Sequence, residues 1–214
     1  LGALIGLDGG SLKTLIGNFF GAFTGPAQVT ALGVILAAGA IIGKTQSEVA
    51  VISGMAALGG GIAAFKCHDL IRGLREAGAS VTPVLTEAGK EFVTPLSISV
   101  LSGSKVYSDL FDLEDETQMG HIELSRNSDL IVIVPATADL LAKMALGLAN
   151  DLASTLLLAT DTDVLAAPAM NVRMWEHPST KQNLNKLKSY GYKIIGPEIG
   201  DMACGEFGEG KMTE

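Results

Sequence analysis

The sequence has little cysteine, little charge and no apolar run as long as a bilayer span. Its 214 residues contain two cysteines, Cys67 and Cys204, which excludes a disulfide framework and a zinc-binding cysteine pattern. This usage is typical of a reducing compartment. Charged residues make up 18% of the chain and the net charge is −8, so the clustered Lys and Arg of a general nucleic-acid binder are missing. We therefore expect no metal and no nucleic-acid partner. A small phosphate-bearing ligand stays compatible with this charge, because helix N-termini bind phosphate through backbone N–H groups.

Residues 1–57 form an apolar extension rich in Gly and Ala that differs from the rest of the chain. Within it, residues 29–43 run for 15 positions without a charge, which is short of the roughly 20 residues of a transmembrane helix. Two interpretations stay open: a buried helix in a larger assembly, or a membrane or pilin-like hairpin. Membrane contact is expected only in the second case. A signal peptide fits poorly, because no basic stretch precedes the apolar run.

Residues 58–214 alternate short apolar runs with helical patterns, which predicts a parallel α/β sheet. The run DLIVIV at 129–134 is typical of a strand buried on both faces. Strands are expected at 81–85, 129–134, 164–167 and 193–195, with a degenerate first strand near 49–53. Helices are expected at 62–77, 95–103, 138–148, 152–158 and 179–190. The pattern indicates a flavodoxin-like, doubly wound, three-layer fold in one domain of residues 58–214.

The first of these helices carries an apolar stripe with helical spacing. The stripe consists of Ala63, Cys67, Leu70, Leu74 and Ala77, and Gly78 ends the helix. Cys67 is therefore expected to be a core thiol. Cys204 lies in a Gly-rich segment near the C-terminus, where a core role is implausible and mobility is expected.

Small or hydroxyl residues follow four of the expected strands. These segments are Gly59 to Gly61, Thr86, residues 135–138 (PATA) and residues 168–171 (PAMN). Each taken singly is ordinary turn chemistry. The carboxyl ends of parallel strands lie along one edge of a sheet, however, and ligands of doubly wound folds bind there. The four segments together predict a site for a flat ligand and its phosphate.

Several longer motifs resemble the homo-oligomeric flavin-containing cysteine decarboxylases. They read GGGIAAFK, LTEAGKEFVTP, MGHIELSRNSDLIVIVPATADLLAKMALGLANDLASTLLLAT, APAMNVRMWEHPSTKQNL and GDMACGEFGEGKMTE. The segment PAMNVRMW at 168–175 fits the family pattern PxMNxxMW completely, and ACGE at 203–206 matches its flap element. The similarity covers residues 59–214 and is greatest to the branch that acts on phosphopantothenoylcysteine in bacterial coenzyme A biosynthesis. Asp139, where the wider family often has Asn, is a marker of that branch.

The resemblance implies an FMN-dependent carboxy-lyase that converts phosphopantothenoylcysteine to 4′-phosphopantetheine. It implies His121 as the general base, Cys204 as the proton donor and Asn171 as the group that holds the substrate carboxylate, with Met174 and Ala203 also contacting substrate. The implied FMN-binding residues are Gly60, Gly61, Ile62, Thr86, Thr137, Ala138, Asp139, Leu140 and Ala169. It also implies a cytoplasmic homotrimer or dodecamer with FMN near the subunit contacts.

Three alternative functions stay open beside this one. A peptidyl-cysteine decarboxylase of antibiotic maturation shares the first motif, and a flavin prenyltransferase shares the fold. The complete PxMNxxMW pattern and the ACGE flap argue against the prenyltransferase. A non-catalytic FMN-binding regulatory subunit belongs to a different class, and the presence of both His121 and Cys204 argues against it.

Overall fold

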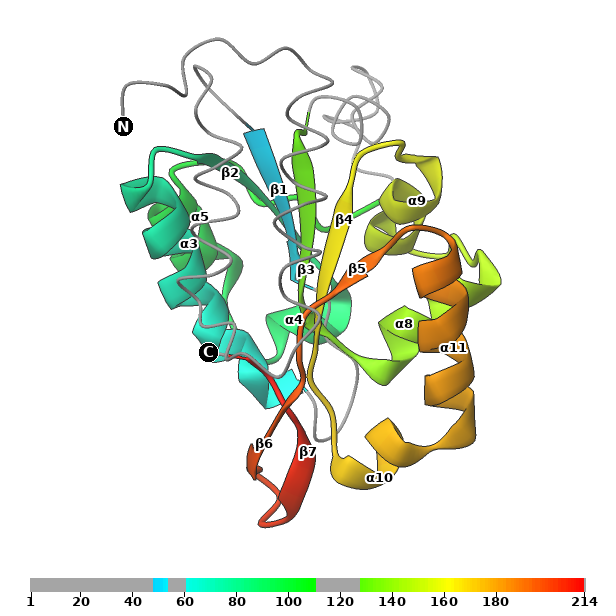
Figure 1. The fold of residues 1–214 in the computed structure, drawn as a ribbon. Coiled ribbons are helices and arrows are strands. Elements are labelled where there is room, and N and C mark those ends of the chain that lie inside the picture. The colour runs from blue at the N-terminus through cyan, green and yellow to red at the C-terminus, as the bar shows by residue number, and fades with distance from the viewer. Residues whose placement is uncertain (1–47, 54–60, 111–127, 214) are drawn as a thin grey trace, which may run out of the picture.

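The computed structural model describes residues 48–53, 61–110 and 128–213 (Figure 1). Within these residues five strands form a parallel sheet in the order β2-β1-β3-β4-β5, and β6 and β7 form a separate antiparallel hairpin. The strands are β1 (Glu48–Ser53), β2 (Ser80–Leu85), β3 (Leu130–Ala136), β4 (Val164–Pro168), β5 (Lys193–Ile194), β6 (Glu198–Asp201) and β7 (Phe207–Lys211). This order is that of flavodoxin-like folds, so the predicted fold class is confirmed.

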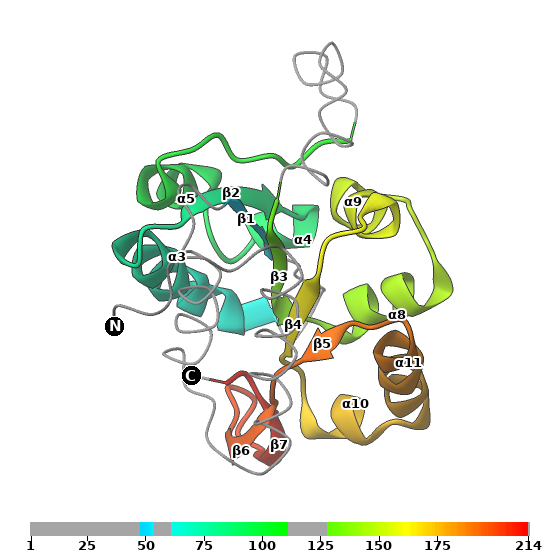
Figure 2. The same cartoon turned by 45° about the horizontal axis from the view of Figure 1, so that its top comes forward.

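Helices cover both faces of the sheet, which gives three layers (Figure 2). Helices α3 and α5 lie on one face, and α8, α9 and α11 lie on the other. The helical elements are η1 (Gly61–Lys66, a 3₁₀ helix), α3 (Cys67–Glu76), α4 (Glu87–Lys90), α5 (Pro95–Ser102), α8 (Ala138–Leu146), α9 (Leu152–Ala159), α10 (Val172–Glu176) and α11 (Pro178–Ser189).

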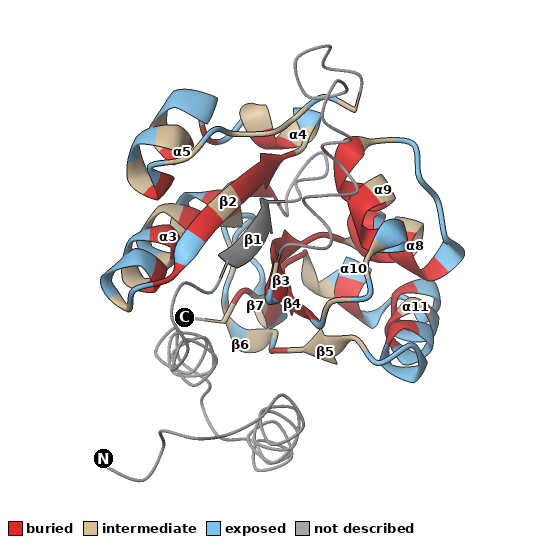
Figure 3. Ribbon diagram, turned by 90° about the horizontal axis from the view of Figure 1, so that it is seen from above, coloured by how far each residue is buried: buried red, intermediate tan, exposed pale blue. Residues whose placement is uncertain are grey.

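Strand β3 shows why the sheet needs helices on both faces (Figure 3). All seven of its residues are buried. Alternate side chains of a strand point to opposite faces. Accordingly, Leu130, Val132 and Val134 pack in the core with α3 and α5, whereas Ile131 and Ile133 pack in the core with α8, α9 and α11. A continuous apolar strand of this kind is stable only between two helical layers.

The expected stripe on the first helix is partly wrong. The buried positions are Ala64, Cys67, Ile71 and Leu74, while Ala63, Leu70 and Ala77 are half-buried. The 3₁₀ helix of residues 61–66 accounts for Ala64 in place of Ala63, because three residues complete one of its turns and bring Ala64 into line with Cys67. Within α3, Ile71 and Leu70 both lie about one turn after Cys67, and Ile71 is the buried one. Cys67 is a core thiol as predicted, and its Sγ donates to Val134 O at 3.0 Å.

The first strand occupies the middle of the sheet. Strand β1 pairs in parallel with β2 on one side and with β3 on the other. It precedes the start of the domain expected at residue 58. Its position is that of the degenerate first strand expected near residues 49–53. None of the helices in the described ranges is long and apolar enough to cross a membrane. The apolar run 29–43 lies outside those ranges.

An ion-pair network joins the first turn of α8 to the start of α9. Asp151 caps α9 by accepting from Ser154 N at 2.7 Å, and Lys143 Nζ contacts both Asp151 (2.8 Å) and Asp139 (3.1 Å). Burial opposes the ionisation of Asp151, but the hydrogen bonds from Lys143 and Ser154 outweigh it, so the pKa of Asp151 lies below its ordinary value. The charged carboxylate therefore stabilises the folded chain.

Asp151→Ala is expected to lower stability by about 1–2 kcal/mol, the usual cost of losing an N-cap, and the melting temperature by about 3–6 °C. Because the folded-state pKa is depressed, this contribution is complete above the unfolded-state pKa of about 4 and disappears as pH falls through the folded-state value. Thermal melts from pH 7 to pH 3 should show the two proteins converging in acid. Asp161→Ala, which removes the same group from an exposed loop, is the control. A pH-independent difference between Asp151→Ala and wild type would contradict the assignment.

Candidate active site

A cavity of about 260 Å³ opens at the carboxyl ends of the strands, between η1, the turn after β4 and the β6–β7 hairpin. Figure 1 shows the hairpin at this edge, next to α10. Five of the predicted site residues line the cavity: Ile62, Ala169, Asn171, Ala203 and Cys204. The structure therefore brings together residues from three segments that are far apart in the sequence.

Asn171 lies at the N-cap of α10, where its amide is fixed from one side. Its Oδ1 accepts from Arg173 N at 2.7 Å, which satisfies one of the N–H groups at the start of the helix. The other end of the amide, Nδ2, is a donor that reaches the hairpin loop. The cap thus determines which end of the Asn171 amide is presented at the cavity.

The hairpin is held against the turn after β4 by its second strand. Met170 N donates to Gly210 O at 3.1 Å, immediately before Asn171. The loop of the hairpin, residues 202–206, is closed by hydrogen bonds from Met202 N to Glu206 O and from Gly205 N to Met202 O, both 2.9 Å. Gly205 has φ +81°, a conformation that favours glycine. This turn places Cys204 at the tip of the hairpin.

Three polar side chains meet beside the cavity, and two of them, Asn171 and Cys204, line it. Asn171 Nδ2 lies 3.5 Å from Cys204 Sγ and donates to Glu206 Oε2, and Cys204 Sγ lies 4.0 Å from the same carboxylate oxygen. Asn171 is half-buried, whereas Cys204 and Glu206 are exposed. The sequence analysis gave Glu206 no role. The signal was present, since Glu206 is the last residue of the ACGE segment, but no spacing rule links it to Asn171.

The remaining predicted cofactor residues follow the neighbouring strands. Thr86 caps α4 after β2 by accepting from Gly89 N at 3.1 Å, and Thr137 caps α8 after β3 by accepting from Leu140 N at 3.3 Å. Ala138, Asp139 and Leu140 form the first turn of α8, and Gly61 and Ile62 begin η1. A Cβ on Gly61 would clash with the ring of Phe92, so only glycine fits there unless that ring moves.

Some predicted residues are not part of this cavity. Met174 lies in α10 but does not line it, and Leu140 is buried in the core. Trp175, the last residue of the PAMNVRMW segment, packs in the core, with Lys181 Nζ 4.0 Å from its ring centre. Gly60 and His121 lie outside the described residues. Among the residues that the structure does describe, no group of three or more His, Cys, Asp or Glu side chains could hold a metal ion.

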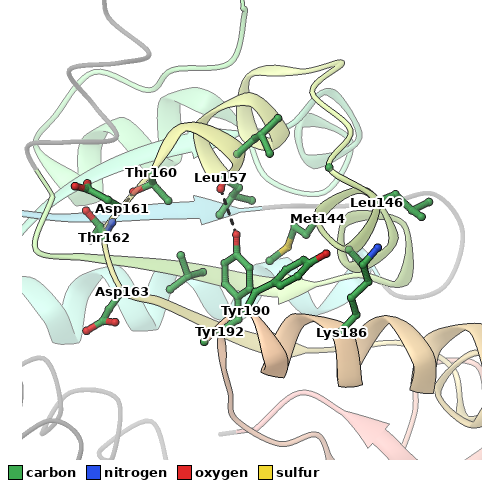
Figure 4. Close-up of a pocket in the computed structure, with 15 residues that line it drawn as sticks. Met144, Leu146, Leu157, Thr160, Asp161, Thr162, Asp163, Lys186, Tyr190 and Tyr192 are labelled. Atoms are coloured by element: carbon green, nitrogen blue, oxygen red, sulfur yellow. Dashed lines mark hydrogen bonds between the residues drawn. The ribbon is translucent and has the colours of Figure 1, made fainter.

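A larger cavity, of about 540 Å³, lies at the opposite edge of the sheet (Figure 4). It is formed by the C-terminal ends of α8, α9 and α11 and by the loop that precedes β4. There Tyr192 Oη donates to Leu157 O at 3.2 Å, and burial raises the pKa of the Tyr192 phenol, so this hydroxyl stays protonated. Because ligands of doubly wound sheets bind at the carboxyl edge, and none of the predicted site residues lines this cavity, we assign the site to the smaller one.

Comparison with known proteins finds relatives similar in sequence and in fold. The Coenzyme A biosynthesis bifunctional protein CoaBC of Vibrio vulnificus (strain YJ016) is 50% identical over 157 residues, which cover 73% of this chain and 39% of that protein. The chain thus spans well under half the length of this curated relative.

Two solved structures share the fold across most of the chain. A PPC decarboxylase mutant complexed with pantothenoylaminoethenethiol superposes with a TM-score of 0.67 at 30% identity, over 80% of this chain and 92% of that one. The FMN binding protein AtHal3 superposes with a TM-score of 0.66 at 32% identity, over 80% of this chain and 90% of that one. The family model described as Flavoprotein matches residues 45–214, a range that begins just before β1 and includes every element of the sheet and the hairpin. The chain belongs to the Flavoprotein family.

Proposed function

We propose that this chain binds FMN and decarboxylates phosphopantothenoylcysteine to 4′-phosphopantetheine, a step of coenzyme A biosynthesis. The observation that carries the proposal is the meeting of Asn171 and Cys204 at a cavity on the carboxyl edge of the sheet. An amide donor suits a carboxylate, and a thiol at the tip of a loop suits a proton donor. The 50% identical CoaBC relative and the PPC decarboxylase structure support the choice of substrate.

The residues at the strand ends fit a flavin mononucleotide. The strand order reverses between β1 and β3, and such a switch point is where doubly wound folds bind nucleotides. The first turn of α8 follows β3 directly, and the N–H groups of Ala138 and Asp139 are of the kind that binds phosphate at a helix N-terminus. Gly61 and Ile62 follow β1 at the other side of the switch point. Ala169 and Met170 give the nearby cavity small and apolar walls for a flat ring.

The chemistry needs an electron sink, because a carboxylate on an unactivated carbon leaves an electron pair with nowhere to go. FMN would supply it, when bound, by taking a hydride equivalent from the cysteine moiety to give a thioaldehyde, which accepts that electron pair, and by returning the hydride after carbon dioxide has left. Asn171 Nδ2 holds the substrate carboxylate, and the cap to Arg173 N keeps that donor pointed at the site. Cys204 gives a proton to the ene-thiol in the last step. His121, outside the described residues, stays the predicted base near the substrate thiol.

The purified protein is expected to be yellow and to release FMN rather than FAD on denaturation, since no segment resembles an adenine-binding unit. With FMN bound, it should convert phosphopantothenoylcysteine to a product lighter by carbon dioxide. Absorbance spectra, chromatography of the released flavin and mass spectrometry of the product measure these outcomes. Colourless protein that FMN cannot reconstitute would rule out the proposal. Bound FMN without turnover would instead favour a regulatory subunit, and turnover only of peptides ending in cysteine would favour a peptidyl-cysteine decarboxylase.

Assembly and location stay predictions. The family resemblance favours a homotrimer or dodecamer in the cytoplasm. Light scattering at assay concentration measures the molar mass of the particle and so tests the expected homotrimer or dodecamer.

A further inference from the structure

Glu206 occupies the donor that the proposed mechanism reserves for the substrate. Its carboxylate accepts from Asn171 Nδ2, the same atom that is to hold the carboxylate of phosphopantothenoylcysteine. Nδ2 carries two N–H groups, and both have partners in the hairpin loop, Glu206 Oε2 and Cys204 Sγ, the latter at 3.5 Å. The oxygen Oδ1 is an acceptor and is already used by Arg173 N at 2.7 Å. A substrate carboxylate that binds Nδ2 must therefore displace one of these two partners.

Two carboxylates at one amide group are unfavourable. Both are negatively charged near neutral pH, and like charges placed together at a binding site lower affinity. Glu206 is exposed, so it can leave Asn171 by rotating into solvent. Binding of the substrate carboxylate at Nδ2 and the Glu206–Asn171 contact therefore oppose each other.

We propose that Glu206 is a positioning residue that gives up Asn171 to the substrate carboxylate and returns to it once that carboxylate has left as carbon dioxide. The inference rests on the proposed function. Decarboxylation breaks the bond between the α-carbon and the carboxyl carbon, leaves its electron pair in the ene-thiol double bond and removes the negative charge that competes with Glu206. Cys204 lies two residues before Glu206 in the same loop, with its Sγ 4.0 Å from Oε2. The return of Glu206 thus restores the contact between its carboxylate and Cys204 Sγ, and this contact positions the proton donor for the ene-thiol after, and not before, carbon dioxide departs.

A binding experiment separates this role from a structural one. Phosphopantothenoyl-S-methylcysteine cannot form a thioaldehyde, because its sulfur is methylated, so it binds without reacting. S-methyl-4′-phosphopantetheine is the same ligand without the carboxylate. Titration calorimetry of the FMN-loaded protein gives the affinity of each ligand for wild type, Glu206→Gln and Glu209→Gln.

Glu206→Gln is expected to bind the carboxylate ligand about tenfold more tightly than wild type does, because the competing charge is gone. Its affinity for the decarboxylated ligand should stay within about twofold, the usual range for an exposed substitution. Glu209→Gln, an exposed acid on β7 of the same hairpin, should change neither affinity by more than about twofold.

The outcomes distinguish the two proposals. If both ligands bind wild type but Glu206→Gln changes their affinities equally, or weakens the carboxylate ligand, Glu206 does not compete with substrate and this inference is wrong. If neither ligand binds wild type, the assigned substrate is wrong and the inference falls with it. A second readout is the product of turnover. Glu206→Ala should release part of its product two hydrogens short of 4′-phosphopantetheine, because Cys204 Sγ then lacks the carboxylate contact that positions it, whereas Glu209→Ala should not.

Discussion

Cys204→Ser is expected to release carbon dioxide but to form saturated 4′-phosphopantetheine at least about 100-fold more slowly than wild type, the scale of losing a general acid. A serine hydroxyl is a far weaker acid than a thiol, whose ordinary pKa is about 8.5. The variant should therefore complete the steps before proton donation and stop at the ene-thiol. Because serine keeps the shape of the side chain, the contact with Asn171 Nδ2 is replaced by a similar one, and the site itself should stay assembled.

Mass spectrometry measures this outcome, since the ene-thiol is two hydrogens lighter than the normal product. Cys67→Ser is the matched control: its hydroxyl can still donate to Val134 O in the core, and its product should be normal. His121→Asn should differ from Cys204→Ser, because loss of the predicted base should abolish carbon dioxide release as well as formation of the saturated product. A Cys204→Ser enzyme that makes saturated product at the wild-type rate would remove Cys204 from the chemistry and leave the hairpin as a cover.

Gly210→Ala should detach the hairpin from the site. Gly210 has φ +148°, and a Cβ there would collide with Met170 O and lie 2.7 Å from Met202 Cε. The backbone oxygen cannot move aside, because Met170 N is bonded to Gly210 O in the same contact. We expect a loss of turnover of about 100-fold, since small misplacements of catalytic groups have effects of this size. Hydrogen exchange of residues 198–211 should rise in the variant, while the rest of the fold stays protected.

Gly191→Ala is the control for backbone strain. Gly191 also has a positive φ, of +93°, but nothing lies within 4 Å of the position of its Cβ, and it is far from the hairpin in the sequence. It should lose about 1 kcal/mol of stability and keep its turnover. Equal losses of turnover in both variants would mean that the collision with Met170 is unimportant.

The order and type of the main elements could be predicted because their signals are local. The run at residues 129–134 became β3, and Thr137 and Asp151 mark the starts of α8 and α9 as caps usually do. The expected helix at 179–190 became α11, which starts at Pro178. The short helices α4 and α10 were missed because four or five residues carry too little periodicity to show a pattern.

The contacts within the site could not be predicted in the same way. Asn171, Cys204 and Ala203 were found through motifs, but the motifs do not say which atoms meet. The contact of Glu206 with Asn171 joins residues 35 positions apart and depends on the docking of a hairpin that was expected only as a Gly-rich segment. Met174 and Trp175 belong to one motif, but the motif does not say which side chain is buried. Trp175 lies in the core, whereas Met174 does not.

The central place of β1 has a consequence for the order in which the molecule folds during synthesis. Its pairing with β2 closes after a short stretch of chain, but its second partner, β3, begins only at Leu130. At ordinary rates of translation that partner emerges roughly 4–15 s after β1 does. During this interval one edge of the strand has no neighbour in the sheet, and open strand edges pair readily with other chains. Nascent chains that pause between β2 and β3 are therefore the ones most exposed to aggregation and most in need of a chaperone.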